Sequence, residues 1–206
     1  MKHEAEIKEL LIHNAIHLIA EGGFERATVK ELTTCGGSLP GFKMNDVYIY
    51  RLFGSKEELY AATFARLDSE VFYHFRRAYK LANESLDESA DLRTRIYAFL
   101  AKAWEFLLND EEKCRCYVRF YYSIYFTGTV AESHRELFSG MIGEMSVAFK
   151  EDADVVSIIH SVFTTMFNFA IRVYNGDLID NEVNRTHIYN VLYNMMVTYF
   201  KDSVRA

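Results

Sequence analysis

Cysteine, proline and long apolar runs are scarce in this chain of 206 residues, which contains three cysteines and one proline. Three is an odd number of cysteines in a chain this large, so we expect no disulfide framework, as in proteins of reducing compartments. No run of eighteen apolar residues offers a membrane span. Residues 1–6 open an acidic, amphipathic helix and not an apolar signal segment. We therefore expect a cytoplasmic protein without membrane association.

Motifs for catalysis and metal binding are also missing. The sequence has no glycine-rich phosphate loop, no nucleophile elbow and no recognisable catalytic triad. Cys114 and Cys116 stand two positions apart and would point in different directions on a helix, which weakens metal or redox sensing as an alternative. His13 and His17 lie one turn apart, but Asn14 follows the first where a metalloprotease carries glutamate. We expect no enzyme activity, no metal and no cofactor.

Basic charge is scarce over the whole chain but is enriched locally. The formal net charge is -6, while hydrophobic residues make up 50% of the chain, enough for a substantial core. Between residues 26 and 56 the balance reverses, with Arg26, Lys30, Lys43, Arg51 and Lys56 against Glu31 and Asp46. A surface that contacts a few phosphates needs only such local charge. A solvated surface of mixed charge is the alternative.

Helix signals dominate the first 60 residues. Apolar residues recur at helical spacing from Ile7 to Ile19 and stop at Gly22. Thr28 and Ser55 each precede a glutamate by three positions, the spacing of a capping box at the start of a helix, and Gly54 is placed to end the helix before Ser55. Three short helices of this kind suggest a helix-turn-helix head that reads DNA.

Past Ser55 the pattern stays helical, with helices expected at residues 59–81, 92–108, 114–126, 132–150, 155–174 and 183–201. The aromatic run at 117–126 is rich in β-formers and is the one stretch where a strand competes. The sequence thus predicts an all-α protein of about nine helices. We divide it into a DNA-binding domain at 1–54 and a helical ligand-binding and dimerisation domain at 55–206.

The N-terminal residues resemble the DNA-binding domain of TetR-type bacterial transcriptional regulators. The resemblance covers roughly residues 7–67 and rests on the segments 21–24, 27–32 and 50–59, above all Tyr-x-x-Phe-x-Ser-Lys-Glu-x-Leu. It implies a homodimer that binds operator DNA and releases it when a small molecule binds. One departure lies at residues 35–44, where about six extra residues, with Pro40 among them, lengthen the turn of the helix-turn-helix. Asn45 then takes the place of the residue that caps the third helix.

The resemblance also implies roles for single residues in the head. Thr28, Tyr50 and Lys56 are expected on backbone phosphates, while Asn45, Asp46 and Tyr48 face base edges or adjacent phosphates. Lys43 and Arg51 complete the predicted DNA-binding set. The lengthened turn either contacts DNA itself or disturbs the docking of the head.

The last two predicted helices carry more apolar surface than one protomer needs, and a symmetric four-helix interface between two copies would bury it. The residues predicted for this dimer interface are Ile159, Phe163, Met166, Phe169, Ala170, Leu192, Met196 and Phe200. A wholly intramolecular core is the alternative.

The middle helices are rich in aromatic residues, which suit the wall of a pocket for a small hydrophobic or aromatic ligand. The predicted ligand-binding residues are Phe72, Tyr73, Phe99, Trp104, Tyr121, Tyr125 and Phe163, although core packing explains any one of them as well. The favoured function is a ligand-responsive DNA-binding regulator, and repression is favoured over activation. The alternative is a helical protein on the same scaffold that binds a small molecule or a partner and no longer reads DNA.

Overall fold

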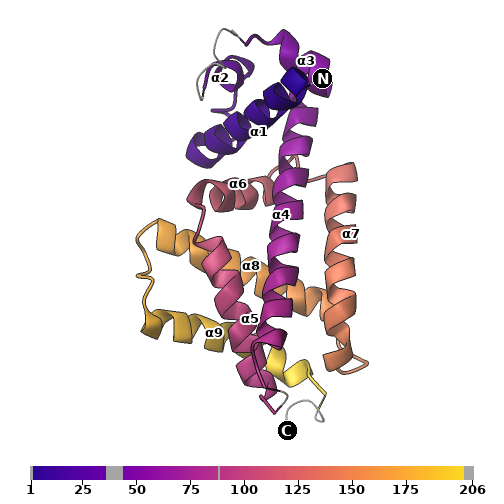
Figure 1. Ribbon diagram of the computed structural model, residues 1–206, viewed down its shortest axis with the longest axis vertical. Coiled ribbons are helices and arrows are strands. Elements are labelled where there is room, and N and C mark those ends of the chain that lie inside the picture. Colours follow the sequence, from indigo (N-terminus) through magenta and orange to yellow (C-terminus); the bar gives the residue numbers. More distant parts are fainter. Residues whose placement is uncertain (1, 36–43, 88, 202–206) are drawn as a thin grey trace. The chain divides into compact units, whose positions relative to one another are not determined.

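The computed structural model describes residues 2–35, 44–87 and 89–201, and in this part the chain is all-α (Figure 1). The helices are α1 (Lys2–Gly22), α2 (Val29–Thr34), α3 (Val47–Phe53), α4 (Lys56–Glu84), α5 (Leu92–Leu107), α6 (Glu111–Tyr121), α7 (Gly128–Met145), α8 (Val155–Tyr174) and α9 (Glu182–Met196). Two short 3-10 helices, η1 (Ser146–Ala148) and η2 (Val197–Tyr199), follow α7 and α9. The predicted all-α class with nine α-helices is confirmed for the described residues.

The chain forms two compact units. The first, here called the head unit, comprises Met1–Ser69 and Glu112–His134; the second, the bundle unit, comprises Glu70–Glu111 and Arg135–Ala206. Helices α4 and α7 each contribute residues to both units. The head unit therefore contains α6 from Glu112 onward, the first half of α4 and the start of α7 in addition to the three N-terminal helices.

The core of the head unit is built on α1. Its apolar side, including Ile7, Leu11 and Ile19, is fully buried, and α2 and α3 pack against this helix. Asn14 is buried on α1 and its side-chain amide donates to the Leu32 carbonyl of α2 at 2.9 Å. A buried amide would be costly without a partner, so this bond fixes where α2 lies on α1.

The helix ends follow the capping signals in the sequence. Thr28 Oγ1 accepts the Glu31 amide hydrogen bond at 3.2 Å, and Ser55 Oγ accepts that of Glu58 at 3.0 Å. Gly54 has a φ of 91°, which only glycine adopts readily, and it ends α3. The predicted capping serine, threonine and glycine are confirmed.

Several predicted boundaries are wrong, and the helix predicted at residues 132–150 spans Gly128–Met145 instead. The cap of α3 is Asp46 and not Asn45, because the Asp46 carboxylate accepts the Val47 amide hydrogen bond at 3.0 Å. Helix α6 ends at Tyr121 and not at residue 126, since the Ser123 hydroxyl donates to the Phe120 carbonyl and accepts from the Tyr125 amide, closing a turn. The predicted last helix ends at Met196, where the chain tightens into η2.

Aromatic packing and a partly buried polar link hold the bundle unit together. Phe72 of α4 stacks on Phe163 of α8, with ring centroids 6.1 Å apart. Trp104 of α5 is fully buried, and its indole N–H donates to Asp180 Oδ1 at 3.1 Å. Asp180 also accepts two hydrogen bonds from Arg185 of α9. This link joins α5 to the connection between α8 and α9.

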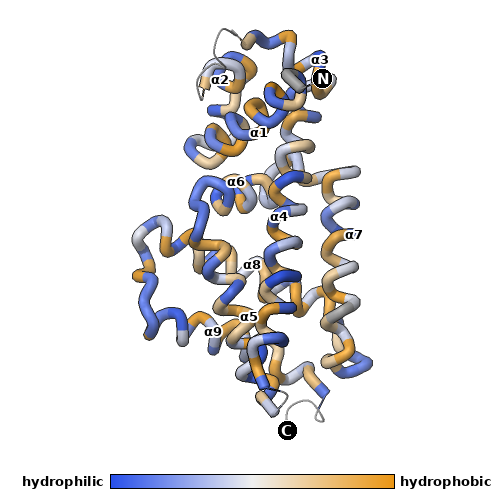
Figure 2. Tube along the Cα trace, in the orientation of Figure 1, coloured by the Kyte–Doolittle hydropathy of each residue, from blue (hydrophilic) through white to orange (hydrophobic). Residues whose placement is uncertain are grey.

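Helix α8 is also the one helix among the described residues that is long and apolar enough to cross a membrane by length and composition. The core helix of a soluble protein passes the same test. Figure 2 shows polar residues interspersed with apolar ones along the helices. In α8 the apolar face packs inward, with Ile159, Val162, Phe163, Met166, Phe167 and Ala170 buried.

Candidate nucleic-acid surface and ligand cavity

Helix α3 offers one face to its own unit and the opposite face to solvent. Ile49 is fully buried against the core, whereas Val47 is 59% exposed and Tyr50 53% exposed. Val47 and Tyr50 are three positions apart and therefore project from the same side of this seven-residue helix. The exposed face of α3 is therefore the candidate contact surface of the head unit.

Most of the predicted DNA-binding residues lie around this face. Asn45 and Asp46 are exposed at the start of α3, and Thr28 is exposed at the start of α2. Tyr48 is half-buried, with the Arg51 guanidinium 4.6 Å from its ring centroid. The predicted residue Lys43 lies outside the described residues. These side chains come from the two helix starts and from α3 itself.

The charges around this face are partly neutralised within the unit. Arg51 Nη2 lies 3.6 Å from Glu4 Oε1 of α1. Lys56 Nζ lies 5.5 Å from the Tyr60 ring centroid. Asp46, an acidic residue on a surface expected to meet phosphate, has a structural role because its carboxylate caps α3. Residue patterns alone did not indicate the pairing of Glu4 with Arg51, which joins two helices.

The start of α4 is fixed to the turn before α2 by Tyr60. The Tyr60 hydroxyl donates to the Ala27 carbonyl at 2.6 Å, and its ring packs on Phe24 and Tyr125. Burial, followed by the nearby Tyr125 and Glu57, raises the pKa of the Tyr60 hydroxyl well above its ordinary value. Tyr125, predicted as a ligand residue, therefore belongs to the core of the head unit.

A second buried polar group in the head unit centres on Asp68 of α4. The Tyr117 hydroxyl donates to Asp68 Oδ1 at 2.9 Å, and His134 Nδ1 lies 3.0 Å from the same oxygen. Burial, together with the Asp68 charge, raises the pKa of Tyr117. Arg119 of the same helix as Tyr117 donates to the Ile19 carbonyl of α1 at 2.8 Å. These contacts, which the sequence pattern does not indicate, hold α6 against α1 and α4.

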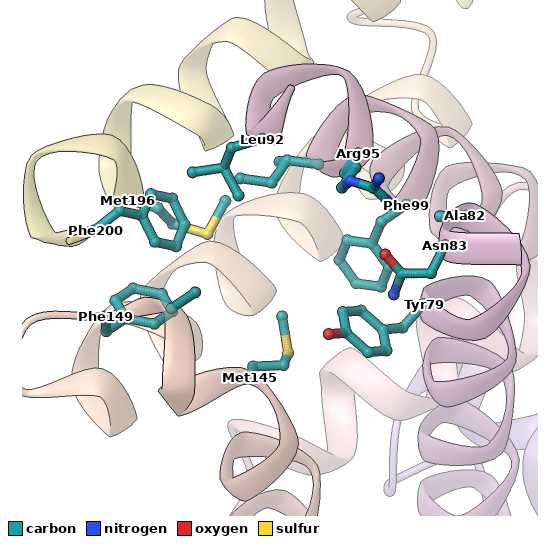
Figure 3. A pocket seen from close by; sticks show the side chains of 12 residues that line it. Tyr79, Ala82, Asn83, Leu92, Arg95, Phe99, Met145, Phe149, Met196 and Phe200 are labelled. Carbon is teal, nitrogen blue, oxygen red and sulfur yellow. The ribbon is translucent and has the colours of Figure 1, made fainter. Parts of the chain in front are cut away.

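The bundle unit contains a cavity of about 220 Å³ (Figure 3). Its lining comes from the end of α4, the start of α5, the end of α7 with η1, and the end of α9 with the segment after η2. The lining residues are Tyr79, Ala82, Asn83, Leu92, Arg95, Ile96, Phe99, Met145, Ala148, Phe149, Met196 and Phe200. Backbone hydrogen bonds from Lys150 to Tyr199 and from Lys201 to Ala148 close one side.

The cavity is apolar apart from one cluster of polar side chains. Tyr79 and Asn83 lie one turn apart on α4, and neither has a hydrogen-bond partner among the described residues. In Figure 3 the Tyr79 hydroxyl points across the cavity toward Met145, and Arg95 lies on the same side as Asn83. Of the described residues that line the cavity, Arg95 carries the single charge.

The predicted ligand-binding residues do not gather in one place. Phe99 alone among them lines the cavity, and Tyr121 and Tyr125 belong to the other unit. Phe72, Trp104 and Phe163 are buried core residues, while Tyr73 is 60% exposed. The other lining residues, among them Met145, Phe149, Met196 and Phe200, lie at or just beyond helix ends, where a sequence pattern does not distinguish a cavity from a packed core.

The predicted dimer residues lie mostly in the core of the bundle unit. Ile159, Phe163, Met166, Ala170, Leu192, Met196 and Phe200 are buried within the protomer, and Phe169 is half-buried. The apolar residues that α8, α9 and η2 expose are Val156, Val183, Val191 and Tyr199. A partner copy would meet these residues together with Phe169.

Metal ligands do not cluster in the described part of the chain, where no group of three or more His, Cys, Asp and Glu side chains is placed to hold an ion. Cys114 and Cys116 are both buried. Burial is also the main cause that raises the pKa of the Cys116 thiol far above its ordinary value. A thiol of this kind is unreactive.

The geometry defines a class of protein, namely a helical protein with a helix-turn-helix unit followed by a helical bundle that contains a cavity. No family model and no curated protein sequence matches the chain. Among solved structures, its fold is that of the TetR-family transcription regulators. A TetR family transcription regulator from Marinobacter aquaeolei VT8 superimposes with a TM-score of 0.72 at 15% identity, over 95% of this chain and 98% of the other.

Two further structures have the same fold. A putative TetR family transcription regulator from Shewanella sp. PV-4 gives a TM-score of 0.68 at 14% identity, over 91% of this chain and 96% of the other. The fatty acid degradation regulator FadR from Bacillus halodurans gives 0.61 at 16% identity, over 89% and 96%. At such identities the likeness establishes the fold.

Proposed function

We propose that this chain is a ligand-responsive DNA-binding transcriptional regulator that acts as a homodimer and represses its target. The observation that carries the proposal is the exposed face of α3, capped at Asp46, ended at Gly54 and seated on α1 by Ile49. Proteins of the same fold are named transcription regulators. A capped short helix with a solvent-facing side is what a major-groove reader requires.

In this proposal the residues around α3 divide into two groups. Thr28, Tyr50 and Lys56 contact backbone phosphates and position the head, whereas Asn45 and Tyr48 reach base edges. Tyr50 is well placed for this role because its side chain is half in solvent. Arg51 forms an ion pair with Glu4 and must weaken or break it to contact a phosphate. It therefore contributes less binding free energy than an arginine without such a pair.

An electrophoretic mobility shift with the DNA that flanks the chain's own gene tests DNA binding. We expect a complex at about 0.1 M salt that an unrelated fragment of the same length and base composition does not displace. Tyr50→Ala should weaken this complex, while Tyr122→Ala, which changes a more exposed tyrosine of the same unit outside the α2–α3 surface, should not. Equal competition by both DNA fragments would argue against operator recognition.

One observation favours the alternative, a protein on this scaffold that binds a small molecule or a partner without reading DNA. Residues 35–46 separate the end of α2 from the start of α3, a longer connection than the resemblance implies. If this connection blocks docking, the mobility shift fails while ligand binding in the bundle unit persists. The mobility shift and a ligand-binding measurement on the same protein therefore distinguish the two functions.

The proposed route from ligand to DNA runs along α4. This helix begins at Lys56, directly after the helix-turn-helix, and supplies Tyr79, Ala82 and Asn83 to the cavity. Dimeric DNA-binding proteins of this kind bind half-sites about 34 to 36 Å apart. A shift of α4 changes the distance between the two DNA-binding heads of the dimer and thereby the affinity for DNA. A coupling of about 1 to 3 kcal/mol suffices, and operator DNA should then weaken ligand binding by the same factor.

A further inference from the structure

We infer that the cavity of the bundle unit selects an uncharged ligand with an apolar body and one hydroxyl group, which Tyr79 and Asn83 recognise. The regulatory meaning of such a ligand rests on the proposed function, whereas the binding itself does not. Three features of the lining point to this class of ligand, namely an apolar wall, a charge that is already compensated and a pair of polar side chains on α4.

The apolar wall determines the body of the ligand. Figure 3 shows Met196, Phe149 and Phe200 across the cavity from Asn83. The rings of Phe149 and Phe200 lie 4.5 Å apart between centroids, and an antiparallel bridge joins the two residues, so this part of the wall is fixed. Met145 and Met196 add flexible thioethers that adapt to irregular shapes. Because the volume of about 220 Å³ lies below the range of about 300 to 1,000 Å³ usual for drug-sized ligands, the body is a short alkyl chain or a single ring.

The charge of Arg95, the one charged residue among the described residues of the lining, is already compensated. Its Nε donates to the Ala90 carbonyl at 3.1 Å and its Nη2 to the Asp87 carbonyl at 2.8 Å. Hydrogen bonds from Ser89, and in addition the Arg95 charge, lower the pKa of the Asp87 carboxyl, so a carboxylate offsets the guanidinium near pH 7. An ionised ligand would lose hydration here without gaining an unpaired counter-charge. The lining therefore disfavours both a carboxylate and an ammonium group.

Tyr79 and Asn83 offer the hydrogen bonds that an uncharged head group needs. They lie one turn apart on α4, which lets them address the same group. An edge-to-face contact with Phe99, with ring centroids 6.4 Å apart, orients the Tyr79 ring. The phenol and the amide can each donate and accept, and neither has a hydrogen-bond partner in the part of the chain that the structure describes. A ligand hydroxyl matches this pair because it also donates and accepts, whereas an ether or a ketone only accepts.

Calorimetric titration of the full chain without DNA tests the ligand class with probes of similar length, namely 1-octanol, its isomer 1-methoxyheptane, octanoate and octylamine. We expect 1-octanol to bind roughly tenfold or more tightly than either charged probe, because the charged heads lose hydration without a free counter-charge. It should also bind several-fold more tightly than the ether, which cannot donate a hydrogen bond. Octanoate binding as tight as that of 1-octanol would overturn the inference, since Arg95 would then act as an uncompensated cation.

Variants of the two polar residues locate the recognition. Tyr79→Phe and Asn83→Leu each remove one polar group at nearly constant size and should weaken 1-octanol binding about 2- to 10-fold, the range for one neutral hydrogen bond. In the double variant the preference for the alcohol over its isomeric ether should disappear. Tyr73→Phe, which removes an exposed hydroxyl on α4 outside the cavity, is the matched control and should preserve that preference. Ala148→Leu should reduce the binding of 1-octanol and of the ether by filling the cavity.

The outcomes separate the ligand class from the regulatory function. A preference for the alcohol that persists in the double variant, or the absence of binding by every probe, would overturn the inference and leave DNA binding untouched. Binding of 1-octanol that leaves the mobility shift unchanged would support the inference and contradict ligand-responsive regulation.

Discussion

At the scale of single residues, a substitution of Lys56 tests how much one positive charge contributes to DNA binding. We predict that Lys56→Ala weakens binding to all DNA sequences alike and reduces the slope of log affinity against log salt by about 0.9, the value for one phosphate contact. Fluorescence anisotropy at several salt concentrations measures this. Lys80→Ala, on the same helix but in the bundle unit and paired with Glu84, should change neither quantity. Altered sequence preference at unchanged overall affinity would contradict the assigned role.

The protonation of Asp180 should change the free energy of unfolding. Hydrogen bonds from Arg185, and in addition from the Trp104 indole, hold the pKa of this carboxyl below its ordinary value. A lowered pKa in the folded state means that the stabilisation is present above the unfolded value of about 3.9 and is lost as pH falls through the folded value. The stabilising contribution of Asp180 should therefore disappear only in acid.

The measurement is urea unfolding followed by the fluorescence of Trp104, the single tryptophan of the chain. Asp180→Asn should cost about 1 kcal/mol near pH 7, because the pair with Arg185 is partly exposed, and the cost should shrink toward pH 3. Asp152→Asn, an exposed position in a loop, is the control and should cost little at either pH. A pH-independent difference between the wild type and Asp180→Asn would mean that the carboxylate charge is not the stabilising feature.

At the scale of elements, two glycines should respond oppositely to the same substitution. Gly54 ends α3 with a φ of 91°, whereas Gly143 lies within α7. At either position an added Cβ would meet no atom within 4 Å. Gly54→Ala should therefore destabilise the head unit by about 1 to 3 kcal/mol through backbone strain alone. Gly143→Ala should stabilise the chain by about 0.5 to 1 kcal/mol. Thermal unfolding by circular dichroism measures both, and a stabilising Gly54→Ala would refute this account of the α3–α4 turn.

The sequence predicted the elements well where a local signal marks both ends. Thr28, Gly54 and Ser55 act within one turn of the chain, so their roles are readable without tertiary structure. The aromatic run after Tyr121 carried no such mark. There the Ser123 hydroxyl competes for backbone groups and ends the helix, an outcome that apolar periodicity does not register.

At the scale of the whole molecule, we predict a homodimer through the exposed side of α8 and α9 that buries about 2,000 Å² in total. Light scattering coupled to size exclusion should report twice the chain mass at micromolar concentration. Phe169→Glu and Val156→Glu should give monomers or aggregate, because each places a carboxylate in the proposed interface. Val147→Glu, at an exposed apolar position in η1, should leave the dimer intact. A well-behaved wild-type monomer would end the dimer proposal.

The sequence alone determined the fold class, the order of the helices and the helix-turn-helix resemblance, because caps, glycine stops and helical periodicity are local properties. Tertiary structure decided which apolar residues form the core, which stay exposed and which line the cavity. Ile159 and Val156 lie on the same helix with similar side chains, yet one is buried and the other exposed. That difference arises from the packing of α8 against the other helices of the bundle unit, which no single segment encodes. The carbonyls of Asp87 and Ala90 that accept hydrogen bonds from Arg95 are likewise supplied by a connection that only folding brings into place.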